Sequence, residues 1–179
     1  TLFRFAGVYF LNKRYPLSVT FISTYRCNFR CSYCNVWQKD VNELTTEEVF
    51  EMIDQLSRLG LRRLGINGGE PLLRKDIGEI IDYSRKKGIT TTLFSNGWLV
   101  KDNINKLKNL NVLLISFDGP KDTHDAQRQI GSYDKVLEAI EAAKSFNLDV
   151  WTNTVISKHN VGQIGFILDK ARELGVKAT

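Results

Sequence analysis

The feature that most constrains the fold is a regular alternation of strand-like and helix-like segments along the 179 residues. Short β-branched and apolar runs indicate strands, and apolar stripes at helical spacing separate them. The strands are expected at residues 17–23, 62–67, 89–94, 112–117 and 148–156, with a sixth starting at 176. Because parallel pairing requires a crossover between strands, the alternation predicts a parallel α/β sheet. We therefore expect a partial parallel (β/α)6 barrel, truncated at the sixth strand. The periodicity is equally consistent with a doubly wound open sheet.

The helices between these strands carry their own start signals. Thr45 and Glu48 form the capping-box pattern in front of an apolar stripe. Asp76 and Ser132 are expected to cap two later helices, because short oxygen-bearing side chains satisfy the free N–H groups of the first turn. An apolar stripe from Ile164 to Leu174 predicts the last helix.

Composition sets the class of protein and its partners. Apolar residues make up 42% and charged residues 25% of the chain, as in ordinary globular domains. The net charge of +5 is mild and no Lys or Arg block marks a nucleic-acid face, so no nucleic-acid partner is expected. The apolar runs are too short to span a bilayer. Three cysteines are an odd count, which argues against a disulfide framework and for a reducing compartment, most simply the cytoplasm.

We divide the chain into two parts. Residues 1–16 form an amphipathic, basic segment that is expected to pack under the barrel as a plug or lid. Contact with a membrane or a lipid-like substrate is the alternative for this segment. Residues 17–179 are expected to form one core domain, which we interpret as a fragment of a longer chain.

Glycine and polar residues follow every predicted strand. They are Cys27, Cys31 and Cys34 after the first strand, Asn67 to Pro71 after the second, Ser95 to Gly97 after the third, Ser116, Asp118 and Gly119 at the fourth, and Asn153 and Thr154 at the fifth. The carboxyl ends of parallel strands meet at one edge of a sheet, which is where ligands bind in such folds. We therefore expect these residues to share one site.

The three cysteines are the strongest chemical signal, with the spacing C-x3-C-x2-C over Cys27, Cys31 and Cys34. Thiolates are soft ligands suited to iron–sulfur clusters and to zinc. A four-iron cluster normally takes four thiolates, so three would leave one iron open to a small molecule. The alternative is a zinc ion held by these cysteines and His124 or His159, in a zinc-stabilised α/β binding module without redox chemistry.

The cysteine motif, followed after the second strand by Gly68-Gly69-Glu70-Pro71, resembles the radical S-adenosylmethionine (SAM) superfamily from Leu17 onward. Residues 67–74 and 116–128 resemble two of its groups: the molybdenum-cofactor starter enzyme and the SPASM-type maturases. The resemblance implies an enzyme with a [4Fe–4S] cluster on the three cysteines and SAM on the open iron. In that family, reductive cleavage of SAM gives a 5′-deoxyadenosyl radical that abstracts hydrogen from the substrate. Here we expect a peptide, cofactor precursor or lipid as substrate, and a flavodoxin or ferredoxin as electron donor.

The resemblance also implies roles in binding SAM. Tyr33 is expected to lie near the adenine, where its ring supplies apolar area. Gly68 and Gly69 are expected to let the backbone approach the SAM ammonium closely. Glu70 is expected to orient that turn or to accept a hydrogen bond from the ammonium. A tight turn before Pro71 without ligand contact is the alternative.

The later strands are expected to complete the site. Ser95 and Asn96 would bind the SAM carboxylate or ribose, although Ser-Asn-Gly is also an ordinary turn sequence. Ser116, a polar residue in an apolar strand, would form a hydrogen bond with SAM. Arg128 would pair with the SAM carboxylate, and a surface ion pair with Asp125 is the alternative. Asn153 and Ile156 would lie beside the adenosine, and a core role is the alternative for Ile156. We assign no acid or base, and expect His124 and His159 to be loop or capping residues.

Overall fold

The computed structural model describes residues 15–179, and its centre is one parallel sheet in the order β1-β2-β3-β4-β5-β6. The strands are β1 (Ser18–Thr24), β2 (Arg63–Gly68), β3 (Thr90–Ser95), β4 (Val112–Ser116), β5 (Asp149–Asn153) and β6 (Lys177–Ala178). The order of the strands in the sheet follows the chain, whereas a doubly wound sheet reverses direction at its switch point. The structure therefore confirms the partial (β/α) barrel and excludes the open doubly wound alternative.

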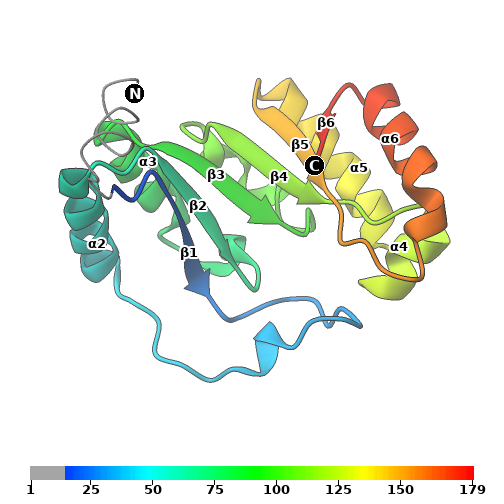
Figure 1. The fold of residues 1–179 in the computed structure, drawn as a ribbon, viewed down its shortest axis with the longest axis horizontal. Coiled ribbons are helices and arrows are strands. Elements are labelled where there is room, and N and C mark those ends of the chain that lie inside the picture. Colours follow the sequence, from blue (N-terminus) through cyan, green and yellow to red (C-terminus); the bar gives the residue numbers. More distant parts are fainter. Residues whose placement is uncertain (1–14) are drawn as a thin grey trace.

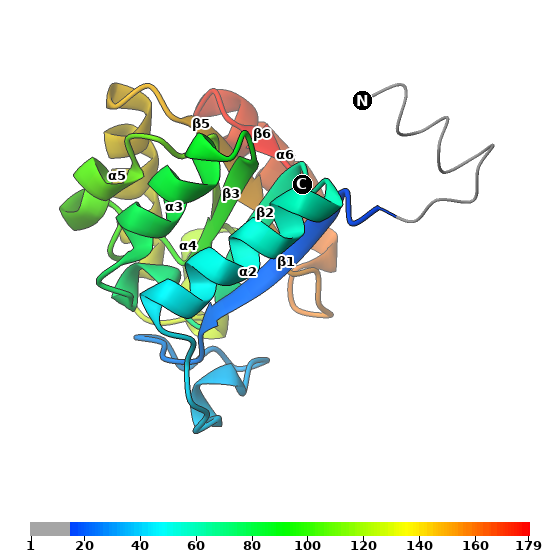
Figure 2. The same cartoon turned by 90° about the vertical axis from the view of Figure 1, so that its left-hand side faces the viewer.

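The helices lie along the outer side of the curved sheet (Figures 1 and 2). The α-helices are α2 (Thr46–Leu59), α3 (Ile77–Lys86), α4 (Lys121–Gln127), α5 (Ser132–Ser145) and α6 (Ile164–Glu173). Short 3₁₀ helices, labelled η, are η1 (Val36–Gln38), η2 (Pro71–Leu73), η3 (Lys101–Leu107) and η4 (Val161–Gln163). Figure 1 shows the loop between β1 and α2, which contains the cysteines, crossing below the arrowheads of the neighbouring strands. This crossing places the cysteines at the carboxyl edge of the sheet.

The core lies between the sheet and its outer helices. Along each strand the side chains alternate, so Leu64 and Ile66 of β2 and Leu113 and Ile115 of β4 are fully buried. The residues between them are half-buried and face the concave side of the sheet. One side of the strands thus holds the helices, while the other remains free to form a site.

The expected helix starts are only partly right. At α2, the Glu48 amide donates to the Thr45 hydroxyl and the Thr45 amide donates to the Glu48 carboxylate, which confirms the capping box. Asp76 occupies the cap position of α3, but its side chain does not cap the helix. Its carboxylate instead accepts from Arg74 and Thr46, because a nearby guanidinium binds a carboxylate more strongly than a backbone amide does.

Helix α4 was not expected from the sequence, and it changes how α5 begins. Ser132 is the first residue of α5 rather than its cap. The cap is supplied from α4: Asp125 accepts hydrogen bonds from the amides of Gly131 and Tyr133 and from the Ser132 hydroxyl. Helix α4 has only seven residues and its buried members are His124 and Gln127, so it carries no apolar stripe to recognise.

Only part of the apolar stripe predicted for the last helix, α6, is buried. Ile167 and Ala171 of α6 are buried as expected, but Ile164 and Leu168 of the same predicted stripe are 38% and 49% exposed. The predicted N-terminal segment falls almost entirely on residues 1–14, outside the described residues. Among residues 15–179, no helix combines the length and apolar character needed to cross a bilayer.

Candidate functional site

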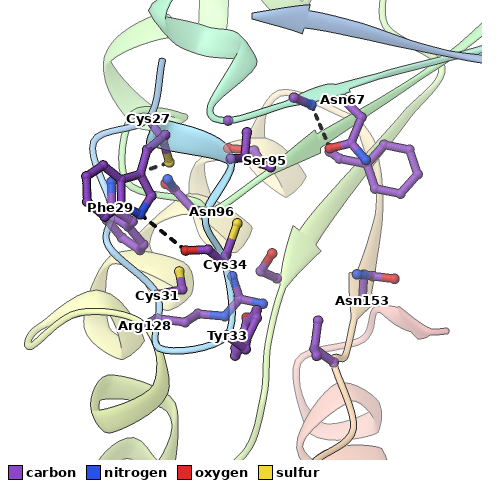
Figure 3. Close-up of a pocket in the computed structure, with 17 residues that line it drawn as sticks. Cys27, Phe29, Cys31, Tyr33, Cys34, Asn67, Ser95, Asn96, Arg128 and Asn153 are labelled. Atoms are coloured by element: carbon purple, nitrogen blue, oxygen red, sulfur yellow. Dashed lines mark hydrogen bonds between the residues drawn. The ribbon is translucent and has the colours of Figure 1, made fainter. Parts of the chain in front are cut away.

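A cavity opens at the carboxyl edge of the sheet, beneath the cysteine loop (Figure 3). Eleven of the thirteen predicted site residues line it. They are Cys27, Cys31, Tyr33, Cys34, Gly68, Gly69, Ser95, Asn96, Ser116, Arg128 and Asn153. The loops after β1, β2 and β3, the ends of β4 and β5, and the end of α4 all contribute, as expected where parallel strands end together. The two predicted residues that do not line the cavity are Glu70 and Ile156.

The cysteine loop has little regular structure, and apolar contacts hold it in place. The Phe29 side chain is fully buried and meets the ring of Trp98 edge-on, with 5.6 Å between the ring centroids. The Phe29 amide donates to the Cys27 sulfur at 3.4 Å. At the other end of the loop, the Trp37 indole donates to the Cys34 carbonyl and the Arg30 guanidinium lies over the Trp37 ring. These contacts present the thiols toward the cavity.

The surroundings of the thiols shift their acidity. Burial raises the pKa of Cys27 and of Cys31. The positive charge of Arg128 opposes this shift at Cys31, while the carboxylate of Glu70 adds to it at Cys27. Such thiols lose their protons when a metal binds, so the site favours the thiol form until a metal is supplied.

The zinc alternative finds no support at this site. Within residues 15–179, no group of three or more His, Cys, Asp or Glu side chains could hold a single metal ion. His124 is fully buried beside Phe117, and its Nδ1 accepts a hydrogen bond from the Asp118 amide at 3.1 Å. Burial lowers the pKa of His124 to about 4, so this residue is a neutral core histidine. His159 is exposed.

The Gly68-Gly69 turn fits tightly against the start of the cysteine loop. The Gly69 amide donates to the Thr24 carbonyl at 2.8 Å, and the Glu70 amide donates to the Arg26 carbonyl at 2.9 Å. A Cβ on Gly69 would lie 2.1 Å from the Arg26 oxygen, and one on Gly68 would lie 2.2 Å from the Thr24 oxygen. The close approach that requires glycine here is therefore an approach to the protein's own backbone.

Glu70 lies behind the cavity rather than in it. Its carboxylate is fully buried and accepts hydrogen bonds from the Leu72 amide, the Asn96 amide and the Ser95 hydroxyl. Burial raises the pKa of Glu70 to about 7, against the opposing effect of these donors. Of the two expected roles, the structure supports orientation of the turn: Glu70 joins the loop after β2 to the loop after β3.

Some polar side chains of the cavity already form hydrogen bonds within the protein, and others do not. Ser95 bonds Glu70, and the Asn96 amide group donates to Asn28 at 2.8 Å and accepts from the Trp98 amide. The side chains of Ser116 and Asn153, in contrast, make no hydrogen bond within the described chain. The ends of β4 and β5 therefore each bring an unoccupied polar side chain to the cavity.

Arg128 forms a buried ion pair, but not with the expected partner. Its Nε lies 2.6 Å from Asp118 Oδ2, and the two side chains are 6% and 0% exposed. The surface pair with Asp125 does not form, because Asp125 is occupied at the start of α5. Asp118 also binds the Val155 amide and the Tyr33 hydroxyl.

The end of β5 corrects one prediction and reveals residues that sequence reasoning missed. The strand ends at Asn153, three residues earlier than expected, so Ile156 is 60% exposed and Val155 lines the cavity in its place. The other lining residues that were not predicted are Phe29, Val36, Trp37 and Phe94, whereas Asn67 was expected at this edge without an assigned role. Most of them are apolar and carry no chemical signature. Phe94 could have been found from strand alternation, because it lies between the buried Leu93 and Ser95 and therefore points to the opposite, concave face.

A singly wound parallel sheet with three thiols at its carboxyl edge defines an α/β protein of the partial-barrel class with a candidate thiolate site. The chain belongs to the radical SAM superfamily, which its sequence matches over residues 21–177. Membership in this family implies an iron–sulfur cluster and SAM. The donor set fits such a group, because three thiols meet one cavity whose other walls combine apolar side chains with the polar groups of Ser116, Arg128 and Asn153.

Two curated relatives illustrate the similarity. Fe-coproporphyrin III synthase from Methanosarcina barkeri is 35% identical over 157 residues, which are 84% of this chain and 39% of that protein. GTP 3′,8-cyclase from Campylobacter jejuni is 38% identical over 150 residues, which are 76% of this chain and 46% of that protein. The chain thus spans less than half the length of these relatives.

Solved structures show the same fold. The structure of anSMEcpe with bound AdoMet superposes with a TM-score of 0.78 at 21% identity, over 90% of this chain and 50% of that one. Streptococcus suis SuiB superposes with a TM-score of 0.77 at 20% identity, over 90% of this chain and 38% of that one. At this level of identity the likeness supports the architecture alone.

Proposed function

We propose that this chain is the catalytic core of a radical SAM enzyme, with a [4Fe–4S] cluster on Cys27, Cys31 and Cys34. The observation that carries this proposal is the meeting of all three thiols with the Gly68-Gly69 turn in one cavity. Three thiolates leave the fourth corner of such a cluster without a protein ligand. That corner is the proposed position for the amino and carboxylate groups of SAM.

When bound, the cluster supplies the electron that splits SAM into methionine and a 5′-deoxyadenosyl radical, which takes a hydrogen atom from the substrate. The protein's own residues bind and orient the nucleotide. Arg128 offers its guanidinium to the SAM carboxylate, and Ser116 and Asn153 offer their unoccupied polar groups to the ribose or adenine. The Tyr33 ring provides apolar area beside the adenine.

Anaerobic purification tests the proposal directly. We expect a brown protein that contains iron and sulfide and that cleaves SAM on reduction. Cys31→Ala should abolish cleavage, because a two-thiolate site loses a cluster ligand, whereas Asp40→Asn, at an exposed position in the same loop, should leave cleavage unchanged. A colourless protein with one zinc ion, or full activity in Cys31→Ala, would contradict the assignment.

For the complete enzyme, we propose a cofactor precursor, peptide or lipid as substrate. The names of the relatives, an Fe-coproporphyrin III synthase and a GTP 3′,8-cyclase, favour the first of these classes. Reduced flavodoxin or ferredoxin is the proposed electron donor. Replacing a chemical reductant with either carrier in the SAM-cleavage assay tests this point. A protein that cleaves SAM with the chemical reductant but with neither carrier would contradict it.

A further inference from the structure

Asp118 sits where three parts of the site meet. It follows β4, its side chain is fully buried, and it accepts hydrogen bonds from three segments that are far apart in the sequence. Val155 N, after β5, is 2.9 Å from Oδ1. Arg128 Nε, at the end of α4, is 2.6 Å from Oδ2, and the Tyr33 hydroxyl of the cysteine loop is 3.0 Å from the same oxygen.

The third of these bonds attaches the middle of the cysteine loop to the sheet. Tyr33 lies between the second and third cysteines, so the bond to Asp118 restrains the segment that carries both thiols. A neighbouring tether has the same effect: the amide and hydroxyl of Ser32 both donate to the Gln127 carbonyl, next to Arg128. The loop is therefore held by α4 and Asp118 rather than by its own regular structure.

The second bond fixes the direction of Arg128. Its guanidinium uses Nε for Asp118, while the two terminal nitrogens make no hydrogen bond to any residue in 15–179. Arg128 lines the cavity, and Figure 3 shows its side chain running between Cys31 and Tyr33. A buried guanidinium needs a paired carboxylate, and Asp118, which does not line the cavity, supplies that charge.

We propose that Asp118 is the positioning residue of the SAM site. It aims the free nitrogens of Arg128 into the cavity and fixes Tyr33, and with it residues 27–34, before cluster or nucleotide binds. The inference rests on the proposed function for the identity of the ligand. The arrangement of the loop is a property of the protein alone.

Only a carboxylate at position 118 can accept hydrogen bonds from all of these donors. Val155 N and Arg128 Nε can only donate, and they approach different oxygens of Asp118. In Asp118→Asn the new NH₂ group must face one of these donors, whichever way the amide is turned. One buried N–H then loses its acceptor and Arg128 loses its counter-charge.

The test compares full-length holoprotein variants by two measurements: SAM affinity without reductant, and hydrogen exchange of residues 27–34. In Asp118→Asn we expect the Kd for SAM to rise at least tenfold and exchange of the loop amides to accelerate at least tenfold relative to those of α3. Asp122→Asn, an exposed position on α4, is the matched control and should stay within twofold in both. A wild-type Kd together with wild-type loop exchange in Asp118→Asn would overturn the proposal.

Two further variants separate positioning from general destabilisation. Arg128→Lys should weaken SAM binding while loop exchange stays near the wild-type rate, because the Tyr33 bond remains. Tyr33→Phe should accelerate loop exchange with a smaller effect on SAM affinity. If both variants change both measurements equally, Asp118 is only a stability residue and the proposal fails. If wild-type protein binds neither cluster nor SAM, the proposed function fails, whereas the exchange measurements still decide the role of Asp118.

Discussion

Substitution of Gly69 by alanine tests how the cysteine loop is joined to the sheet. The backbone of Gly69 adopts an ordinary φ, so alanine is not excluded by its own conformation. The obstacle is space: the new Cβ would lie 2.1 Å from the carbonyl oxygen of Arg26 and 2.6 Å from the carbonyl carbon. Both are backbone atoms, and no side-chain rotation can relieve the overlap.

The expected cost follows from the movement required. An ordinary contact needs about 1 Å more space, and overpacking of this kind costs about 1–3 kcal/mol. Moving the two segments apart also strains the bonds from Gly69 N to Thr24 O and from Glu70 N to Arg26 O, each of which contributes about 1 kcal/mol. We expect Gly69→Ala to lower the free energy of unfolding by roughly 2–5 kcal/mol and, because Cys27 follows Arg26, to reduce the iron bound per chain.

Gly165→Ala is the matched control, because the same substitution at this position should raise the free energy of unfolding rather than lower it. Gly165 lies in α6, and a Cβ there would meet no atom within 4 Å. Alanine in a helix stabilises by about 0.5–1 kcal/mol relative to glycine. Urea denaturation of both variants measures the two effects. A Gly69→Ala protein as stable as wild type, with full iron content, would refute the contact between turn and loop.

Three further substitutions probe burial, capping and packing. Buried Glu70 has a pKa of about 7, above the usual 4.5, so its folded state holds a proton that the unfolded chain releases. The wild type should therefore lose about 3 kcal/mol of its free energy of unfolding between pH 4.5 and 7 as Glu70 ionises. Denaturation at pH 5 and 8 should show this loss in the wild type and not in Glu70→Gln. Thr45→Ala should cost about 1 kcal/mol by thermal denaturation, because the Glu48 amide loses its cap; no change would contradict the capping box. Phe29→Ala should cost about 3–5 kcal/mol in urea, because it empties a fully buried site against Trp98, and a cost below about 1 kcal/mol would show that the loop does not depend on this anchor.

The sheet and the location of the site followed from sequence because both depend on periodic patterns. Alternating burial, as in Leu64 and Ile66, marks strands, and the repeated crossovers make them parallel. Once the strands are parallel, residues as distant as Cys27 and Asn153 must meet at one edge. The expectation needed no knowledge of any single contact.

The sequence-based predictions were wrong where the chain has no helical or strand periodicity. Helix α4 is short and buries polar residues, so its amphipathicity is invisible at helical spacing. The sequence predicts the end of β5 three residues late, because Val155 and Ile156 continue a β-branched run although the strand ends at Asn153. A strand boundary decides which side chain faces a cavity, and this small error exchanged Val155 for Ile156.

The partner of Arg128 shows a different kind of limit. Asp125 is three residues away, in the helix that ends just before Arg128, so local spacing favours it, yet the structure pairs Arg128 with Asp118. The choice is made by competition: the free amides at the start of α5 occupy Asp125, and the buried Asp118 carboxylate requires a cation. The C-x3-C-x2-C spacing is local in the same sense. It identifies three thiols, but the bond that sets their direction joins Tyr33 to a residue 85 positions away, and only the folded chain brings that partner to the loop.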